Sequence, residues 1–454
     1  DATMNEENII MNRLKKSALS MAVSLALLGG TGAAYAVVNV QCPGDNDGDA
    51  AWNTTTGKNK DDPPGSRNGP PINTKCMHLI AGDSFVKMSD GNPIYTFGFG
   101  DQTGTLPEDV IAEGILDAWW PGPTIELEEG DEFYLSLTNV GTVIRPDLFD
   151  PHTVHWHGFP NAATVFDGVP EVSISINMGA TLTYYYNVVQ PGTYMYHCHV
   201  EATEHMEMGM LANLYVHPAQ DVSGCTDPLV CPVAGRKGGP GGGTAVGEPQ
   251  GYVYNDDDGT TGWDVEKAIQ VSSFDSEFHD ASVFVQPLPF ADLEADYPMI
   301  NGRGYPDTLI AGALPAPTDN VDPVAGYDPG KITGTAGEIL NNGTPTQNLD
   351  SVIEVTAGQK LLLRLSNLSV DQFYTMTAQG LTMQVVGTGA KHMRGVDGKN
   401  IYKEVASVNI GGGEVNDILI DTAGVAPGTY FLYSTELHQM SNLTQLDGGM
   451  ITEI

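Results

Sequence analysis

Apolar and polar side chains alternate along several short runs of the chain. In one such run the apolar residues Phe133, Leu135 and Leu137 stand at every second position. Because side chains of a β-strand point alternately to the two faces of a sheet, this pattern predicts a strand with one apolar and one polar face. Similar runs predict successive strands from Phe85 to Val140 and a further strand over Leu211 to Val216.

Turn-forming residues separate these runs, since the chain contains 54 Gly and 29 Pro among its 454 residues. Short runs rich in Val, Ile, Tyr and Thr between such turns are typical of all-β sandwiches. The length allows two or three domains of about 150 residues each. We expect residues 1–36 to precede the mature protein, 37–218 to form a first domain, 219–265 a Gly-rich linker and 266–454 a second domain.

Acidic residues dominate the charge of the chain. The 57 Asp and Glu residues exceed the 20 Lys and Arg residues, which gives a formal net charge of −37. Such a surface repels nucleic acids and anionic membranes and favours cationic partners, and it also keeps an exported protein soluble. We therefore expect no nucleic-acid partner. No segment after residue 36 is long and apolar enough to predict a membrane span.

The stretch from Met11 to Ala36 has the pattern of a secretory signal peptide. A basic segment is followed by an apolar core over Ser17 to Gly30 and by a cleavage-type ending at Ala34 to Ala36. The apolar core is too short for a comfortable membrane span. We therefore expect a secreted or periplasmic protein.

Cysteine usage supports export to an oxidising compartment. Cys42 with Cys76, and Cys225 with Cys231, are the natural disulfide pairs among the five cysteines. Cys198 is left over. An odd cysteine in an exported protein requires an explanation, and metal ligation provides one.

Six of the 11 histidines lie close to Cys198 in the sequence, at His152, His155, His157, His197, His199 and His205. Alternation along a strand sends His197 and His199 to one face and Cys198 to the other. His155 and His157 share a face for the same reason, and His152 falls on the opposite face, with Cys198. The tripeptide 197–199 therefore serves two sites.

The donor types indicate copper. A thiolate, two imidazoles and a weak axial thioether are the ligands of an electron-transfer blue copper site, and Cys198, His152, His205 and Met210 supply that set. The other four imidazoles form a second, nitrogen-only group. The two groups are joined through the peptide bonds that flank Cys198, which predicts a built-in electron path.

This segment resembles the multicopper oxidases, a family with the cupredoxin fold that includes the laccases. The resemblance rests on His-Trp-His-Gly at 155–158, Asp-Gly at 167–168 and Pro-Gly-Thr-Tyr-x-Tyr-His-Cys-His at 191–199. It implies two cupredoxin-like Greek-key domains. It also implies an activity in which a type 1 copper takes electrons from a reductant and a trinuclear copper cluster reduces dioxygen.

Carried over by motif, the resemblance assigns each ligand a role. The type 1 ligands are Cys198, His152, His205 and Met210, and the first three of these are the residues we expect to be catalytic. His155 is assigned to type 2 copper, and His157, His197 and His199 to the type 3 pair. The family usually places the second type 1 histidine five residues after the cysteine, where this chain has Thr203. His205 stands seven residues after it, which we interpret as a two-residue insertion.

The second domain resembles the family in its strands but not in its ligands. Residues 297–303, 361–367 and 427–430 match family segments, whereas 374–380 and 433–436 lack histidine where the family has ligand motifs. His392 and His438 stand outside any ligand motif. Two-domain members complete the cluster at a subunit interface, so the resemblance implies a homo-oligomer, most simply a trimer. A neighbouring second domain would then offer only residues such as Thr377, Gln379, Glu436 or His438.

Three functions fit this pattern. The first is a secreted laccase-like oxidase that takes electrons from a small reductant or a low-valent metal ion and passes them to dioxygen if the cluster is complete. The second is a copper-binding electron-transfer or structural protein with an incomplete cluster. The third is a relative of copper nitrite reductase, against which the second histidine of His197-Cys198-His199 argues.

The insertion after Cys198 bears on the reductant. Met206 and Met208 lie among Glu201, Glu204 and Glu207, a soft and acidic combination suited to Cu(I) or another cation. The alternative is a solvated loop with one packed methionine, which we slightly favour.

Overall fold

Four sheets of four or more strands make up most of the described chain. The computed structural model describes residues 38–43, 73–160, 162–223, 249–319 and 337–454. One sheet of the first half has the strand order β2 (Pro93–Asp101), β1 (Thr74–Lys87), β4 (Glu132–Gly141) and β6 (Thr181–Asn187). The other has the order β3 (Ile125–Glu128), β8 (Leu211–His217), β7 (Gly192–His197) and β5 (His155–His157). β1 is parallel to β4 and β3 to β8, while the other pairs are antiparallel.

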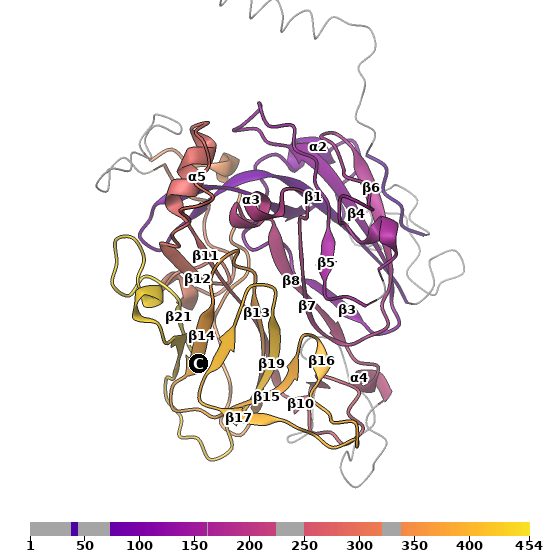
Figure 1. Ribbon diagram of the computed structural model, residues 1–454, viewed down its shortest axis with the longest axis vertical. Helices are drawn as coiled ribbons and strands as arrows, with labels where there is room; N and C mark the ends of the chain where they lie inside the picture. The colour runs from indigo at the N-terminus through magenta and orange to yellow at the C-terminus, as the bar shows by residue number, and fades with distance from the viewer. Residues whose placement is uncertain (1–37, 44–72, 161, 224–248, 320–336) are drawn as a thin grey trace, which may run out of the picture. The chain divides into compact units, whose positions relative to one another are not determined.

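The second half repeats this plan with a larger first sheet. Its strand order is β12 (Tyr297–Ile300), β11 (Val265–Phe274), β13 (Lys360–Asn367), β19 (Val415–Asp421), β15 (Met383–Thr388) and β16 (Lys391–His392), with β17 (Lys403–Val405) also paired to β15. Its second sheet has the order β18 (Val408–Ile410), β14 (Tyr374–Ala378), β20 (Phe431–Ser434) and β21 (Ile451–Glu453). Figure 1 shows these strands in orange and yellow, and those of the first half in indigo and magenta. The expected all-β class is confirmed.

The helices within the described residues are short. They are α2 (Val110–Glu113), α3 (Ala202–Glu207), α4 (Gln220–Ser223) and α5 (Ser276–Val283). The 3₁₀ turns include η2 (Thr164–Phe166), η3 (Asp307–Leu309), η5 (Asn341–Gly343) and η6 (Leu437–Met440). Asp275 caps α5, because its side chain accepts a hydrogen bond from the amide of Phe278. In the part of the chain that the structure describes, no helix combines the length and the apolar character needed to cross a bilayer.

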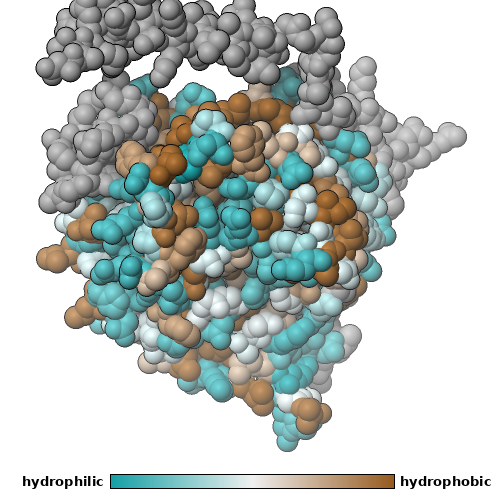
Figure 2. All heavy atoms as spheres, turned by 45° about the horizontal axis from the view of Figure 1, so that its top comes forward, coloured by the Kyte–Doolittle hydropathy of each residue, from teal (hydrophilic) through white to brown (hydrophobic). Residues whose placement is uncertain are grey.

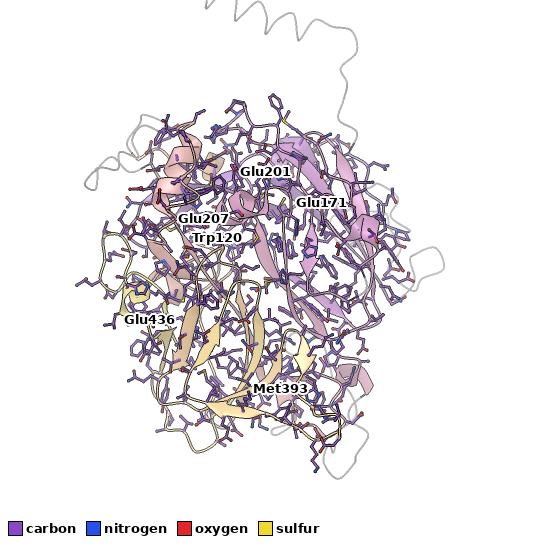
Figure 3. All side chains as sticks on the ribbon, in the orientation of Figure 1. Trp120, Glu171, Glu201, Glu207, Met393 and Glu436 are labelled. Carbon is purple, nitrogen blue, oxygen red and sulfur yellow. A yellow bond between two sulfur atoms is a disulfide. The ribbon has the colours of Figure 1, made fainter. Side chains whose placement is uncertain are left out.

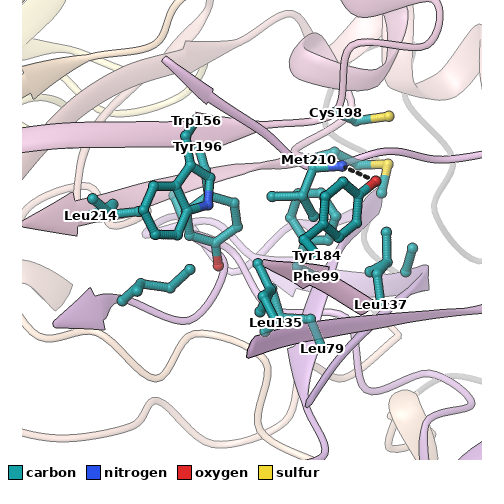
Figure 4. Packing of buried hydrophobic residues seen from close by; sticks show 14 of the residues in the cluster. Leu79, Phe99, Leu135, Leu137, Trp156, Tyr184, Tyr196, Cys198, Met210 and Leu214 are labelled. Carbon is teal, nitrogen blue, oxygen red and sulfur yellow. Dashed lines mark hydrogen bonds between the residues drawn. The ribbon is translucent and has the colours of Figure 1, made fainter. Parts of the chain in front are cut away.

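The core of the first half lies between its two sheets. Phe133, Leu135 and Leu137 are buried there, as their alternation predicts. Figure 4 shows Leu135 and Leu137 facing Trp156 and Tyr196 of the opposite sheet, with Tyr184 of the neighbouring strand β6 beside them. Trp156 stacks on Tyr186 with ring centroids 3.7 Å apart, and aromatic pairs of this kind stabilise a core beyond the area they bury.

The other face of β4 is polar, as the alternation predicts, but it is buried rather than exposed to solvent. Ser136 and Thr138 are fully buried there. The hydroxyl of Ser136 is hydrogen-bonded to that of Thr183 at 2.7 Å, and the hydroxyl of Thr138 lies 2.7 Å from both Thr181 and His78 Nε2. These hydrogen bonds across neighbouring strands offset the free-energy cost of burying the hydroxyl groups. The polar face of β4 is therefore an internal row of hydrogen-bonded side chains.

The cysteine prediction is confirmed where the structure describes it. Cys42 and Cys76 form a disulfide, which ties the segment 38–43 to β1, and Cys198 is a free, buried thiol. The second expected pair, Cys225 with Cys231, lies outside the described residues, as do the signal-peptide pattern and much of the expected linker.

Part of the expected linker is packed against the second half. β9 (Gly251–Tyr252) and β10 (Gly262–Trp263) form a two-stranded hairpin, and Val253, Tyr254 and Trp263 are buried with Leu362 and Leu419. The described residues from Val38 to the C-terminus thus belong to one compact unit.

The two halves share an apolar contact. Trp120 of the first half stacks on Phe274 of the second with ring centroids 4.3 Å apart, and Met195, Met299 and Val415 are buried in the same cluster. The solvent-exposed surface has no such large apolar area on the face that Figure 2 presents, where hydrophilic side chains are interspersed with small hydrophobic patches. The contact sets the position of the second half's loops against the histidines of the first.

Candidate metal centres

The structure brings the expected type 1 residues together at one end of β7. Cys198 follows β7 directly, His152 pairs with Ile176 in an isolated bridge, and His205 lies in α3. The sulfur of Cys198 is 3.2 Å from Nδ1 of His205 and 3.8 Å from Nδ1 of His152. All three side chains are buried. A thiol and two imidazole nitrogens therefore converge on one point.

Backbone hydrogen bonds position Met210 at the same place. The Cys198 amide donates a hydrogen bond to the Met210 carbonyl at 3.0 Å, and the Met210 amide donates one to the His205 carbonyl at 2.8 Å. Figure 4 shows the sulfur atoms of Cys198 and Met210 pointing to the same side of the core. Met210 is fully buried. The thioether is thus positioned beside the thiol by the loop that carries both.

The segment from Cys198 to His205, whose spacing is two residues longer than usual in the family, contains the start of helix α3. Glu201 adopts a left-handed conformation (φ 44°), α3 follows, and Gly209 (φ 114°) ends the turn. The helix returns His205 to Cys198 although the loop is longer. Figure 3 shows Glu201 and Glu207 near α3, and Glu207 is buried where it accepts a hydrogen bond from the amide of Asp275.

The other four histidines gather on the opposite side of the tripeptide. His155 and His197 are register partners across β5 and β7, and their rings are 5.2 Å apart. Nδ1 of His157 lies 3.3 Å from Nε2 of His197. The His199 ring lies 5.1 Å from that of His155 and 5.7 Å from that of His197. The observed grouping of these histidines is the one that alternation of side chains along a strand predicts.

Burial favours the neutral form of five of the six histidines in the two groups. It lowers the pKa of His197 to about 3 and that of His205 to about 4, and it holds the pKa of His152 well below its ordinary value. The pKa values of His155 and His157 are lowered for the same reason, with neighbouring histidines adding to the effect. Neutral imidazole is the form that binds metal ions.

The donor set fits copper at both groups. Burial raises the pKa of the Cys198 thiol to about 11, so an apolar site without a cation would keep it protonated, and a bound metal ion would favour the thiolate. Nδ1 of His155 is hydrogen-bonded to the Asp167 carbonyl at 2.6 Å, which orients the ring and leaves Nε2 for a metal. A buried thiol, neutral imidazoles and a thioether are the ligands that copper selects.

The second half contributes a glycine to the histidine group. A Cβ at Gly413 would lie 3.1 Å from Cε1 and Nε2 of His157. The three histidines of residues 266–454 lie elsewhere. His279 contacts the Tyr95 carbonyl, His392 is hydrogen-bonded to Tyr402, and His438 is exposed. Glu436 is likewise exposed, on the turn after β20 (Figure 3).

Comparison with known proteins identifies the family. Two family profiles, both described as multicopper oxidase, match residues 113–221 and 315–454, together more than half of the chain. The chain belongs to the multicopper oxidase family. It is 24% identical to a laccase from Phlebia radiata over 319 residues, which are 69% of this chain and 46% of the laccase. The chain spans less than half the length of the curated relatives it matches.

Solved structures of multicopper oxidases share the fold. The blue copper oxidase from Nitrosomonas europaea matches with a TM-score of 0.55 at 19% identity, over 84% of this chain and 85% of that one. A copper-containing nitrite reductase from Thermus scotoductus matches with a TM-score of 0.50 at 16% identity, over 84% of this chain and 61% of that one. At these identities the likeness shows the fold alone. The expected cupredoxin-like fold class is confirmed.

Some residues around the two groups were not anticipated from the sequence. Asp150 lies with a carboxylate oxygen 3.9 Å from Nε2 of His205, and Gly413 lies against His157. His279 is a further buried histidine that no motif in the sequence marks. Asp150 is close to His152 in the sequence, so the acidic neighbour was a usable signal. Gly413 gave none, since its place depends on how the two halves pack.

Proposed function

We propose that this multicopper oxidase relative is a copper-dependent oxidoreductase. A small reductant or a low-valent metal ion would deliver electrons beside Cys198, His152, His205 and Met210, and dioxygen would be reduced at His155, His157, His197 and His199. Copper would supply the one-electron redox chemistry at both groups. The observation that carries the proposal is that His197, Cys198 and His199 are consecutive and contribute to both groups.

The chain's own residues perform three tasks in this scheme. Cys198 links the groups, because the peptide bonds on its two sides lead directly to His197 and His199. Burial of His152, His205 and Met210 excludes water and holds the donor geometry rigid. The Asp167 carbonyl fixes the orientation of His155. A rigid ligand set favours electron transfer, since little has to move when the charge changes.

The surroundings of His205 favour a cationic or neutral reductant. Asp150 is near Nε2 of His205, and burial, with the nearby charges of Glu201 and Asp150, raises the pKa of Glu204 to about 7. An anionic reductant would be repelled by this acidic rim. Met208 is fully buried and Met206 packs against the shared core, so the methionines of this loop serve packing.

We further propose export and self-association. The Cys42 and Cys76 disulfide supports an oxidising compartment, outside the cell or in the periplasm. One chain supplies four histidines to the second group, and a complete cluster in this family requires more than four. We therefore expect a homo-oligomer, most simply a trimer. Light scattering at micromolar concentration tests this, and a monomer would count against it.

An incomplete cluster supports a second candidate function, that of a copper-binding electron-transfer or structural protein. Beside His157 the second half contributes Gly413, which has no side chain to bind a metal ion. The histidines of the second half lie elsewhere. The fold likeness to a nitrite reductase supports a third candidate. Against it, His199 contacts His155 and His197, so both neighbours of Cys198 belong to one nitrogen group.

The deciding experiment combines copper analysis with oxygen uptake. Copper-loaded protein should show an intense thiolate-to-copper visible band that Cys198→Ser abolishes. An oxidase with a complete cluster should hold four coppers per chain and consume oxygen rapidly with a phenolic donor, Cu(I) or Mn(II). Because one chain supplies four histidines to the second group, we expect fewer than four coppers and slow turnover. One copper, a blue band and no oxygen uptake would favour the electron-transfer role.

A further inference from the structure

A second type of donor cluster lies at the far end of β8, away from both copper groups. His217 ends that strand, six residues after Leu211, which at the rise of a β-strand is about 20 Å. Nε2 of His217 lies 2.8 Å from Oε1 of Glu126 on β3 and 3.7 Å from Oε2 of Glu266 on β11. These three donor atoms lie within 4.8 Å of one another. The first half supplies two of them and the second half supplies the third.

Each carboxylate is held by one oxygen and presents the other to His217. Oε2 of Glu126 accepts a hydrogen bond from the Tyr215 hydroxyl at 3.4 Å, and Oε1 of Glu266 accepts one from Nε of Arg364 at 2.5 Å. Asp221 accepts one from the Tyr252 amide through Oδ1, while its Oδ2 lies 3.5 Å from Nδ1 of His217. Three neighbours thus orient three carboxylates toward one imidazole.

The charge at this place favours a cation. The buried carboxylate of Asp417 lies 3.5 Å from the Arg364 guanidinium, which also binds Glu266. Glu126, Asp221, Glu266 and Asp417 together exceed the single guanidinium by three negative charges when His217 is neutral.

The geometry points to a binding site for a divalent cation of the zinc class, ligated by His217, Glu126 and Glu266. Zinc binds imidazole nitrogen and carboxylate oxygen at about 2.0–2.2 Å, which places tetrahedral ligand atoms about 3.4 Å apart. The two separations from Nε2 lie on either side of that value. Asp221 at Nδ1 would act as the outer carboxylate that orients a metal-binding histidine. The side chain of Glu126 is 43% exposed, which leaves an entry path from solvent.

Such an ion would join the two halves of the chain. Glu126 and His217 come from neighbouring strands of the first half, and Glu266 begins the long strand β11 of the second. A cation bound only in the folded state stabilises it, because its binding free energy adds to that of folding. The site is structural, and the proposal does not depend on the activity at the copper groups.

The test uses the copper-loaded full chain, first treated with EDTA to remove loosely held metal. Equilibrium dialysis against Zn²⁺, with zinc and copper measured together, should show one zinc gained per chain and no copper lost. Glu126→Gln removes a half-exposed ligand and should weaken zinc binding at least tenfold. Glu132→Gln, a carboxylate on β4 in the other sheet, is the matched control and should bind as the unaltered protein does.

Thermal unfolding provides a second readout. Zn²⁺ should raise the Tm of the unaltered protein and of Glu132→Gln, and should leave that of His217→Gln unchanged. The proposal is overturned if the copper-loaded protein gains no zinc, if zinc is gained only as copper is lost, or if Glu126→Gln binds zinc as tightly as Glu132→Gln.

Discussion

Gly413 lies against the ring of His157, so closely that a Cβ at position 413 would be 3.1 Å from Cε1 and Nε2. Its φ of +82° is a left-handed conformation that glycine adopts readily. The glycine follows β18 in the second half, whereas His157 ends β5 in the first. The backbone of the second half at Gly413 therefore packs against one of the expected copper ligands.

Replacing this glycine should disturb the histidine group. We expect Gly413→Ala to lower the free energy of unfolding by about 1–2 kcal/mol through backbone strain and also to displace His157, which reduces copper per chain. Gly424→Ala is the matched control, because Gly424 has a φ of +80° but no neighbouring atom within 4 Å. It should show the loss of stability with full copper content. Equal copper content in the two variants would mean that the contact with His157 is unimportant.

His78 should make the protein sensitive to acid. Burial lowers its pKa from 6.5 to about 4, while its Nε2 stays hydrogen-bonded to Thr138. The unfolded chain binds a proton below pH 6.5 and the folded chain does not, so stability is intact above pH 6.5 and falls down to about pH 4. The loss from this one group amounts to about 3 kcal/mol.

The comparison that isolates this effect uses two substitutions. His78→Gln can keep a donor near Thr138 without a titrating group, so its free energy of unfolding should fall less than that of the unaltered protein between pH 7 and pH 4.5. His438→Gln, at an exposed histidine, should follow the unaltered protein. Urea unfolding at several pH values measures both, and parallel curves for all three proteins would refute the assignment.

Arg364 should be essential for joining the halves. It is fully buried, and its guanidinium donates to Glu266 and to the Thr193 hydroxyl at 2.9 Å while lying 4.9 Å above the Tyr215 ring. Asp417 is buried beside it. Arg364→Met leaves two carboxylates without their cation, and breaking a buried pair in this way costs about 3–5 kcal/mol.

A less buried arginine provides the control for that variant. Arg394 pairs with Asp258 at 2.8 Å, and both side chains are partly exposed. Arg394→Met should cost less than about 1 kcal/mol. Both variants are compared by urea unfolding in the presence of EDTA, so that a metal bound near Glu266 does not contribute. If Arg364→Met is no more destabilising than Arg394→Met, the buried cation does not hold the halves together.

Features that depend only on local backbone geometry could be predicted from the sequence alone. Alternation along a strand placed Cys198 opposite His197 and His199, and it identified Phe133, Leu135 and Leu137 as core residues. These inferences need only the period of two of a β-strand, which holds wherever the strand lies. The disulfide between Cys42 and Cys76 followed from simple counting.

Contacts between segments far apart in the sequence could not be predicted in this way and are known from the structure. The burial of Ser136 and Thr138 depends on cross-strand partners, and the place of Gly413 beside His157 depends on how the two halves pack. Likewise, Glu126, His217 and Glu266 come from three strands, and no local pattern marks them as neighbours. Sheet register and the packing of one half on the other are set by contacts between residues far apart in the chain, which periodicity does not encode.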